Sequence, residues 1–365
     1  MPSATLDGSK SSGPAPSGPI LVIFPGALGD LICVIPALRA IARQHPGAPI
    51  ELMARAELAR FATGRLGFPH GHREGDAKGD LLDLGHRHSC ALSRGHSIDR
   101  REVAQLFAAR SGQIEKEARA FFGSFAHVYS FFASDDAHFC TALTAATGGR
   151  ASFYPFRPTG AGHVAAGYLR ENGTENDAEP ENGTKTSEIE ALAALNCSFD
   201  LYPEELDLAE DRLAGLGLAA GNFMLILPGS GSKAKNWPVE NFVSIATMLS
   251  PAAMMTQRIR PLVILGPAES GLEPSFNAAG ITVLSQLELA EVAALASLSR
   301  CFIGNDSGVS HLAAAAGAPG LVLFGPTDPE RWRPLGRTRV LQRDPLSAIT
   351  LTEAMATMLK MIDGK

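Results

Sequence analysis

Short apolar runs that end in a glycine turn recur along the chain, and they constrain its fold more than any other feature. Ile20–Phe24 is followed by a turn that holds Gly26 and Gly29, and Leu321–Phe324 is followed by Gly325. Unbroken runs of this length are typical of strands covered on both faces, as in a parallel sheet with crossover helices. The pattern therefore predicts an α/β protein.

Alternating strands and helices are expected in both halves of the chain. The expected strands are 20–24, 50–53, 126–132, 151–154, 223–227, 262–265, 281–284, 301–303 and 321–324. The expected helices are 30–44, 239–249, 288–299, 309–316 and 351–361. Because this alternation is that of βαβ units, each half is expected to form a Rossmann-like, doubly wound parallel sheet.

The length and composition of the chain predict two folded domains. A chain of 365 residues with 45% hydrophobic and 19% charged residues is sufficient for two cores. An acidic stretch that repeats Glu-Asn-Gly-Thr has the composition of a linker. The expected segments are a disordered tail over 1–18, an N-terminal domain over 19–170, a linker over 171–200, a C-terminal domain over 201–345 and a helix within 346–365. This last helix is expected to pack back on the N-terminal domain.

Charge, cysteine content and hydropathy narrow the function classes. A net charge of −6 provides no basic field for a polyanion, so nucleic acid is not an expected partner. The five cysteines are scattered without a C-x-x-C pair, which indicates reduced thiols in a cytoplasmic protein. No apolar leader or membrane anchor is recognised, so any association with the inner membrane would be peripheral.

The first candidate site is the turn around Gly26, Gly29 and Asp30, between an expected strand and helix. Glycines here let a ligand approach the backbone, and the start of the helix presents free N–H groups. Asp30 has an ordinary alternative role as the N-cap or first-turn acid of the helix. The G-x-x-G spacing does not match the dinucleotide fingerprint, so a dehydrogenase is disfavoured.

The second and third candidate sites follow expected strands in the C-terminal half. Ser230, Gly231 and Lys235 lie in a loop of small residues, where backbone N–H groups and an ammonium would suit a phosphate. An ordinary surface loop is the alternative. In the third cluster, Asp306 or Ser307 would cap a helix and Gly308 would let a diphosphate reach its N–H groups.

Three kinds of isolated polar residue complete the candidates. His311, on the first turn of the third cluster, is near enough to contact a phosphate or is a structural histidine. Glu269, after an expected strand, is either a surface acid or a ligand of ribose hydroxyls. The H-x-H pairs at His70/His72 and His86/His88 lack a matching set of ligands, so solvated loop is favoured over a metal site.

Three stretches together resemble the bacterial heptosyltransferase-type glycosyltransferases, the ninth glycosyltransferase family, which have the GT-B architecture. They are Ile20–Leu38 (ILVIFPGALGDLICVIPAL), Leu225–Phe242 (LILPGSGSKAKNWPVENF) and Phe302–Thr327 (FIGNDSGVSHLAAAAGAPGLVLFGPT). Phe24 and Pro25 stand where many relatives carry a basic residue. The stretch between His70 and His96 and the acidic insertion are not family features.

The resemblance implies an inverting, metal-independent transfer of a sugar from a nucleotide-sugar donor to a lipid-linked or oligosaccharide acceptor of the lipopolysaccharide core. It implies an acceptor site in the N-terminal domain, with Asp30 as general base, and a donor site in the C-terminal domain. Lys235, Ser230 and Gly231 match the diphosphate contacts, and Glu269 matches a ribose-binding glutamate. Asp306, Ser307 and Gly308 match the segment at the diphosphate and donor sugar. No metal or other cofactor is expected, and a monomer is expected.

Two other classes of function remain open at this stage. A sugar-nucleotide epimerase of GT-B architecture would bind the same kind of donor without a separate acceptor. A non-catalytic protein that binds sugar nucleotides would keep the fold without the reaction. The donor sugar, the acceptor and the linkage are not specified by the sequence.

Overall fold

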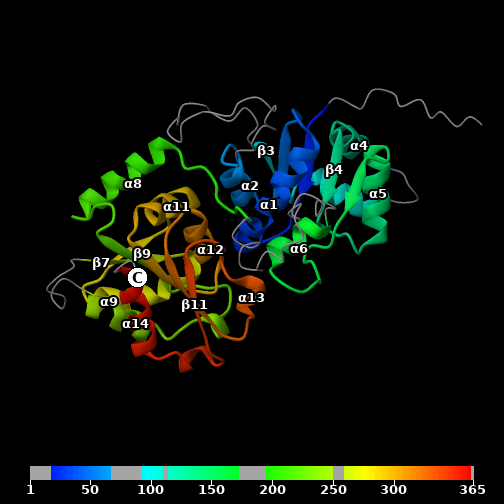
Figure 1. Ribbon diagram of the computed structural model, residues 1–365. Coiled ribbons are helices and arrows are strands. Elements are labelled where there is room, and N and C mark those ends of the chain that lie inside the picture. The colour runs from blue at the N-terminus through cyan, green and yellow to red at the C-terminus, as the bar shows by residue number, and fades with distance from the viewer. Residues whose placement is uncertain (1–17, 67–91, 110–113, 172–194, 250–258, 363–365) are drawn as a thin grey trace, which may run out of the picture.

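Two α/β domains stand side by side in the computed structural model of the protein (Figure 1). The structure describes residues 18–66, 92–109, 114–171, 195–249, 259–362. Residues 1–17 of the proposed tail, the pairs His70/His72 and His86/His88, and most of the acidic insertion lie outside these residues. The two sheets fall within 19–170 and 201–345, and the exact domain boundaries stay a prediction.

The N-terminal domain is built on a five-stranded parallel sheet in the order β3-β2-β1-β4-β5. Its strands are β1 (Ile20–Ile23), β2 (Ile50–Ala54), β3 (Leu92–Ser97), β4 (His127–Ser130) and β5 (Ala151–Phe153). Its helices are α1 (Leu28–Gln44), α2 (Ala56–Ala62), α3 (Arg101–Ala108), α4 (Lys116–Phe122), α5 (Ala137–Thr147) and α6 (Val164–Glu171). The sequence predicted four of these strands and missed β3.

The C-terminal domain is built on a six-stranded parallel sheet in the order β11-β10-β9-β6-β7-β8. Its strands are β6 (Phe223–Leu227), β7 (Arg260–Leu265), β8 (Thr282–Ser285), β9 (Cys301–Asn305), β10 (Gly320–Phe324) and β11 (Thr338–Gln342). Its α-helices are α8 (Pro203–Gly215), α9 (Val239–Leu249), α10 (Glu273–Ala278), α11 (Leu289–Leu298), α12 (Gly308–Ala315), α13 (Pro329–Trp332) and α14 (Leu351–Ile362). Short 3₁₀ turns occur at Lys233–Lys235, Pro267–Leu272 and Leu346–Ala348. The predicted fold of two doubly wound parallel sheets is confirmed.

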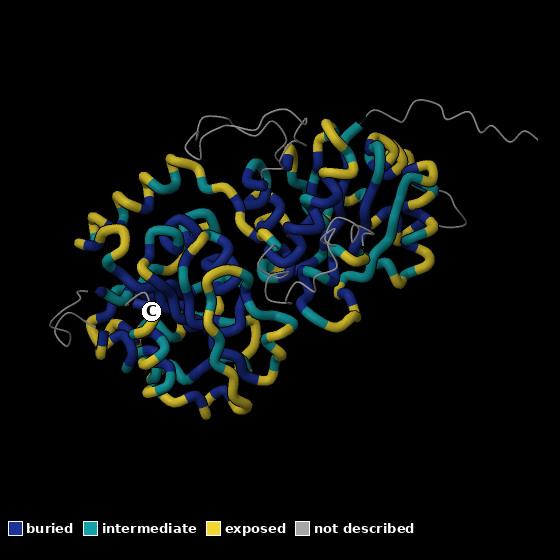
Figure 2. Tube along the Cα trace, in the orientation of Figure 1, coloured by how far each residue is buried: buried dark blue, intermediate teal, exposed yellow. Residues whose placement is uncertain are grey.

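The hydrophobic core is continuous across the two domains rather than divided into two. Helices α1 and α12 pack against each other, and their buried faces join one cluster that includes residues of both sheets. Two further clusters lie within single domains, on the opposite faces of the sheets. In Figure 2, buried residues, in dark blue, run through each domain and also lie where the two domains meet. The domains are therefore docked along a substantial apolar contact.

The final helix, α14, does not pack on the N-terminal domain, so that expectation is wrong. It packs on α9, β9 and β10 of its own domain (Figure 1). Ala354, Met358 and Ile362 repeat every four residues along one face, and all three are buried with the C-terminal sheet. Arg300, before β9, also donates a hydrogen bond to the Ile362 carbonyl. Burial of this apolar face, about 25 cal/mol for each Å² removed from water, fixes the helix there.

The strand orders determine where a ligand can bind. Each sheet reverses its winding at one point, between β1 and β4 in the first and between β6 and β9 in the second. Loops that leave such a point at the carboxyl ends of parallel strands diverge and leave a crevice. The residues after β1, β6 and β9 are therefore the expected lining of a site.

None of the helices that the structure describes has the length and apolar character needed to cross a bilayer. The four cysteines within the described residues, Cys33, Cys140, Cys197 and Cys301, are free thiols.

Candidate active site

A pocket of about 620 Å³ lies between the two domains, at the crevice that the strand orders predict. From the N-terminal domain it is lined by the start of α1 and by Arg157. From the C-terminal domain it is lined by the loop after β6, by Glu269, by the start of α12 and by residues of the chain beyond β10. Of the predicted site residues, it brings together Gly29, Asp30, Ser230, Gly231, Lys235, Glu269, Asp306, Ser307, Gly308 and His311.

Asp30 lies in the first turn of α1, and it is buried. Its Oδ2 accepts a hydrogen bond of 3.1 Å from the backbone N–H of Ala27, the residue that begins the helix. The described residues make no hydrogen bond to its other oxygen, Oδ1. Its role as a first-turn acid is therefore confirmed, and this role leaves one carboxylate oxygen available at the pocket.

Glycines allow the two domains to approach closely at the pocket. A β-carbon on Gly308 would lie 3.0 Å from the backbone nitrogen of Gly29, so the first turns of α1 and α12 are in contact. Both helices begin at the pocket, and both direct the positive ends of their dipoles towards it. Gly26 is not among the lining residues; a β-carbon there would clash with the Phe24 ring and with Asp30. Gly26 shapes the turn that carries Asp30.

Lys235, in the loop after β6, forms an ion pair with Asp306 at the pocket. The Lys235 Nζ lies 2.7 Å from Asp306 Oδ2, and the Thr327 hydroxyl donates to the same oxygen at 2.6 Å. Of the two predicted caps, Ser307 is the one that caps α12, because its side chain accepts from the Ser310 N–H. Asp306 lies one residue too early for that role and instead holds the lysine beside the start of the helix.

The loop after β6 is fixed by a buried asparagine. Asn305, at the end of β9, donates from Nδ2 to the Pro228 carbonyl at 2.7 Å and accepts from the Trp237 N–H at 3.1 Å. These bonds anchor both ends of the loop that presents Ser230 and Gly231. The Ser230 hydroxyl lies 2.6 Å from Asn236 Oδ1 and from the Ser232 carbonyl, so it is held within its own loop.

Glu269 lies against two glycine backbones. A β-carbon on Gly229 would lie 2.5 Å from the Glu269 carboxyl carbon, and one on Gly266 would lie 2.7 Å from its Oε2. The carboxylate therefore lies across the loops that follow β6 and β7. These loops need glycine to make room for it.

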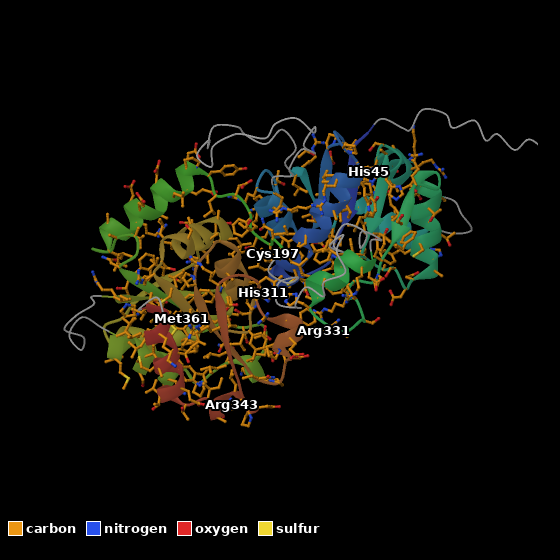
Figure 3. All side chains as sticks on the ribbon, viewed as in Figure 1. His45, Cys197, His311, Arg331, Arg343 and Met361 are labelled. Atoms are coloured by element: carbon orange, nitrogen blue, oxygen red, sulfur yellow. The ribbon has the colours of Figure 1, made fainter. Side chains whose placement is uncertain are left out.

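His311 lies deep in the domain contact (Figure 3). Its Nδ1 is 3.6 Å from the Cys33 thiol, and its ring also hydrogen-bonds to the backbone of Trp332. Burial lowers the pKa of His311 to about 4, so the ring is neutral near pH 7. His311 lines the pocket without a charge for a phosphate, and its Nδ1 contacts the Cys33 thiol.

The lining residues that were not predicted as site residues include Arg157, Thr327 and Trp332. Thr327 ends one of the quoted family stretches, and Arg157 follows an expected strand over 151–154. Both therefore stand beyond the carboxyl ends of strands, and this position was a signal that could have found them. Trp332 comes from α13, a helix of four residues that begins with an Asp328 cap followed by Pro329.

Comparison with known proteins supports the family resemblance noted in the sequence. Residues 190–350 match the profile of Glycosyltransferase family 9 (heptosyltransferase). This part of the chain is therefore similar to glycosyltransferase family 9. The match covers β6 to β11 and includes every predicted donor-side residue. The expected resemblance to family 9 is confirmed.

Solved structures with low sequence identity share the fold of nearly the whole chain. A family 9 glycosyl transferase from Veillonella parvula has a TM-score of 0.67 at 15% identity, over 96% of this chain and 99% of that one. The ADP-heptose lps heptosyltransferase II from E. coli has a TM-score of 0.64 at 16% identity, over 95% and 99%. The GT-B architecture predicted from the sequence is thereby confirmed.

A curated sequence relative is Lipopolysaccharide heptosyltransferase 1 of Escherichia coli K12, which is 25% identical over 155 residues. The matched region is 42% of this chain and 48% of that protein. The chain thus spans about half the length of the curated relatives it matches.

Proposed function

We propose that this protein is an inverting glycosyltransferase that moves a sugar from a nucleoside diphosphate donor to a carbohydrate acceptor of lipopolysaccharide-core type. The observation that carries the proposal is the shared pocket, because Asp30 from one domain and Lys235 from the other line it together. The family 9 profile and the heptosyltransferase relatives support this class of reaction.

The donor side suits a nucleoside diphosphate. Lys235 and the free N–H groups at the start of α12 supply positive charge for a diphosphate. Glu269 lies at the neighbouring loops, where a carboxylate can accept hydrogen bonds from ribose hydroxyls. The name of the E. coli relative, an ADP-heptose heptosyltransferase, makes an ADP-heptose-type donor the first to test.

Asp30 is the proposed general base. The acceptor hydroxyl attacks C1 of the donor sugar and passes its proton to Oδ1 of Asp30 as the new bond forms. The bond between C1 and the diphosphate oxygen breaks, and its electrons leave with the diphosphate. Attack from the side opposite to the leaving group inverts the configuration at C1.

Lys235 and the two helix starts stabilise the departing diphosphate in this proposal, so that no metal ion is required. Docking of the two domains excludes water that would hydrolyse the donor. A lipid-linked acceptor would bring the protein to the cytoplasmic face of the inner membrane, where its contact would be peripheral.

A ligand screen tests the donor class. The protein is heated with ADP, UDP, GDP and CDP, and a preferred diphosphate should raise the apparent melting temperature by mass action. Turnover is then measured with the matching heptose donor and a core oligosaccharide, with and without EDTA. We expect transfer that EDTA does not reduce. If no diphosphate stabilises the protein, the donor assignment is wrong.

Incubation with the donor alone separates transferase from epimerase. A transferase leaves the donor sugar unchanged when no acceptor is present, whereas an epimerase produces an isomer. An isomer would overturn the proposal in favour of the epimerase.

A further inference from the structure

Arg157 approaches Asp30 from the segment that follows β5. Its Nη2 lies 3.6 Å from Asp30 Oδ2, the same oxygen that accepts from Ala27. The guanidinium carbon lies 5.1 Å from the centre of the Phe156 ring and 5.4 Å from that of Trp332. Phe156 belongs to the N-terminal domain and Trp332 to α13 of the C-terminal domain. Both domains therefore define the position of this cation.

Two further side chains make hydrogen bonds between the segment after Arg157 and α13 with the residue that follows it. Arg331 donates hydrogen bonds to the carbonyls of Pro158 and, at 2.8 Å, Gly160. Nε2 of the buried His163 lies 2.8 Å from the Arg333 carbonyl. Figure 3 shows Arg331 beside the N-terminal domain, whereas Arg343 lies at the far end of the C-terminal domain. We name Arg157, His163, Arg331 and Trp332 the interdomain clamp.

The His163 contact has a defined direction. Burial lowers the pKa of His163, so its ring is neutral near pH 7. Its Nδ1 accepts from the Ala165 N–H at 3.2 Å, which leaves Nε2 to carry the proton and donate it to the Arg333 carbonyl. Within the clamp, Arg331 of the C-terminal domain donates to backbone carbonyls of the N-terminal domain. In return, His163 of the N-terminal domain donates to a backbone carbonyl of the C-terminal domain.

Stability alone does not account for the pair of Arg157 and Asp30. The Arg157 side chain is 57% exposed, and exposed ion pairs contribute little to folding because water screens them. Its location is specific, however, since aromatic rings from two domains hold it at the pocket beside the proposed base. An oriented carboxylate is what a general base requires.

We propose that Arg157 is a positioning residue for Asp30 and that the interdomain clamp delivers it only when the domains are docked. The guanidinium and the Ala27 N–H together hold Oδ2, so that Oδ1 faces the acceptor hydroxyl. The inference rests on the proposed function, because it assigns a role within the same reaction.

The first test replaces Arg157 and separates kcat from binding. In Arg157→Gln, kcat should fall about tenfold, since a misplaced catalytic group reduces turnover on this order. The donor Kd and the acceptor KM should change less than about twofold, because neither ligand is held by Arg157 in this account. Arg157→Lys keeps the positive charge and should recover part of the lost kcat. Arg343→Gln removes a comparable exposed pair, with Glu353 at 2.8 Å, and should leave kcat unchanged.

The second test breaks the clamp outside the pocket. Arg331 is not among the described residues that line the pocket, so Arg331→Met should reduce kcat only by releasing Arg157. Arg337 donates to the Gly317 carbonyl within the C-terminal domain, which makes Arg337→Met the matched control. The double variant Arg157→Gln/Arg331→Met should lose no more kcat than Arg157→Gln alone.

The outcomes distinguish this inference from the proposed function. If the wild-type protein transfers no sugar, both are wrong. If it does, and Arg157→Gln keeps the wild-type kcat, the positioning role alone is wrong. A raised acceptor KM with unchanged kcat would also overturn it, because Arg157 would then bind the acceptor.

Discussion

Gly308 at the start of α12 lies directly against Gly29 at the start of α1, with 3.0 Å between a β-carbon built on Gly308 and the Gly29 backbone nitrogen. This contact brings together two helix starts that belong to different domains. It also brings Asp30, one residue after Gly29, close to the C-terminal lining of the pocket. The glycine pair thus limits how far apart the proposed base and the start of α12 can lie.

Gly308→Ala should therefore impair both docking and turnover. The added methyl group would push against the Gly29 nitrogen and Leu28, and such overpacking costs about 1–3 kcal/mol. We expect a lower melting temperature and a kcat reduced about tenfold. Gly215→Ala, at a helical glycine with open space around its β-carbon position, should not reduce either quantity. Wild-type kcat in Gly308→Ala would mean that close approach at this point is not required.

Lys235→Met should weaken the binding of a nucleoside diphosphate. The ammonium is held beside the start of α12 by Asp306, and a charge-assisted hydrogen bond contributes about 1.5–3 kcal/mol. The Kd measured by calorimetry should rise about 10- to 100-fold. Lys233→Met changes an exposed lysine of the same 3₁₀ turn that does not line the pocket, and it serves as the control. Equal affinities of the two variants would remove Lys235 from the diphosphate site.

His311 should make folding sensitive to acid. Its pKa is lowered from 6.5 to about 4 by burial, so between these values the unfolded chain binds a proton that the folded chain does not. The free energy of unfolding then falls as the pH falls, by about 1.4 kcal/mol per pH unit. From pH 7 to pH 5, wild-type protein should lose about 2 kcal/mol more than His311→Gln.

Urea unfolding at the two pH values measures this difference. The half-buried His45 and His127 and the buried His163 also have lowered pKa values, but both proteins contain them, so their effects cancel in the comparison. His138→Gln, at an exposed position, should behave as wild type. Parallel pH dependences for wild type and His311→Gln would contradict a neutral, buried His311.

The central strands of both sheets could be predicted because their apolar character is local in sequence. Phe223–Leu227 and Leu321–Phe324 are buried at every residue, and the apolar run alone indicates this. β3 could not be found in this way, since Leu92–Ser97 has one buried apolar residue. It is held instead by pairing with β2 and by His96, whose Nε2 lies 2.6 Å from Glu51. Those partners lie far away in the sequence.

The site was predictable where glycine and polar residues follow a strand, as at Gly29, Lys235 and Asp306. The partners of these side chains were not, because they depend on how the domains dock. Asp306 or Ser307 was expected to cap a helix; Ser307 does so, and Asp306 pairs with Lys235 from another loop. His311 was expected either near a phosphate or as a structural histidine, and the sequence could not show that domain contact buries it against Cys33. Arg157 lies at Asp30 because aromatic rings of both domains hold it there.

The account depends most on Asp30 as the base, and Asp30→Asn tests it most directly. Asparagine keeps the size of the side chain and an oxygen for the Ala27 N–H, but it cannot accept the proton of the acceptor hydroxyl. Glu240→Gln, at an exposed first-turn acid of α9, is the control. We expect kcat of Asp30→Asn to fall by about 10²–10⁴-fold with donor affinity unchanged. Wild-type turnover by Asp30→Asn would contradict the account.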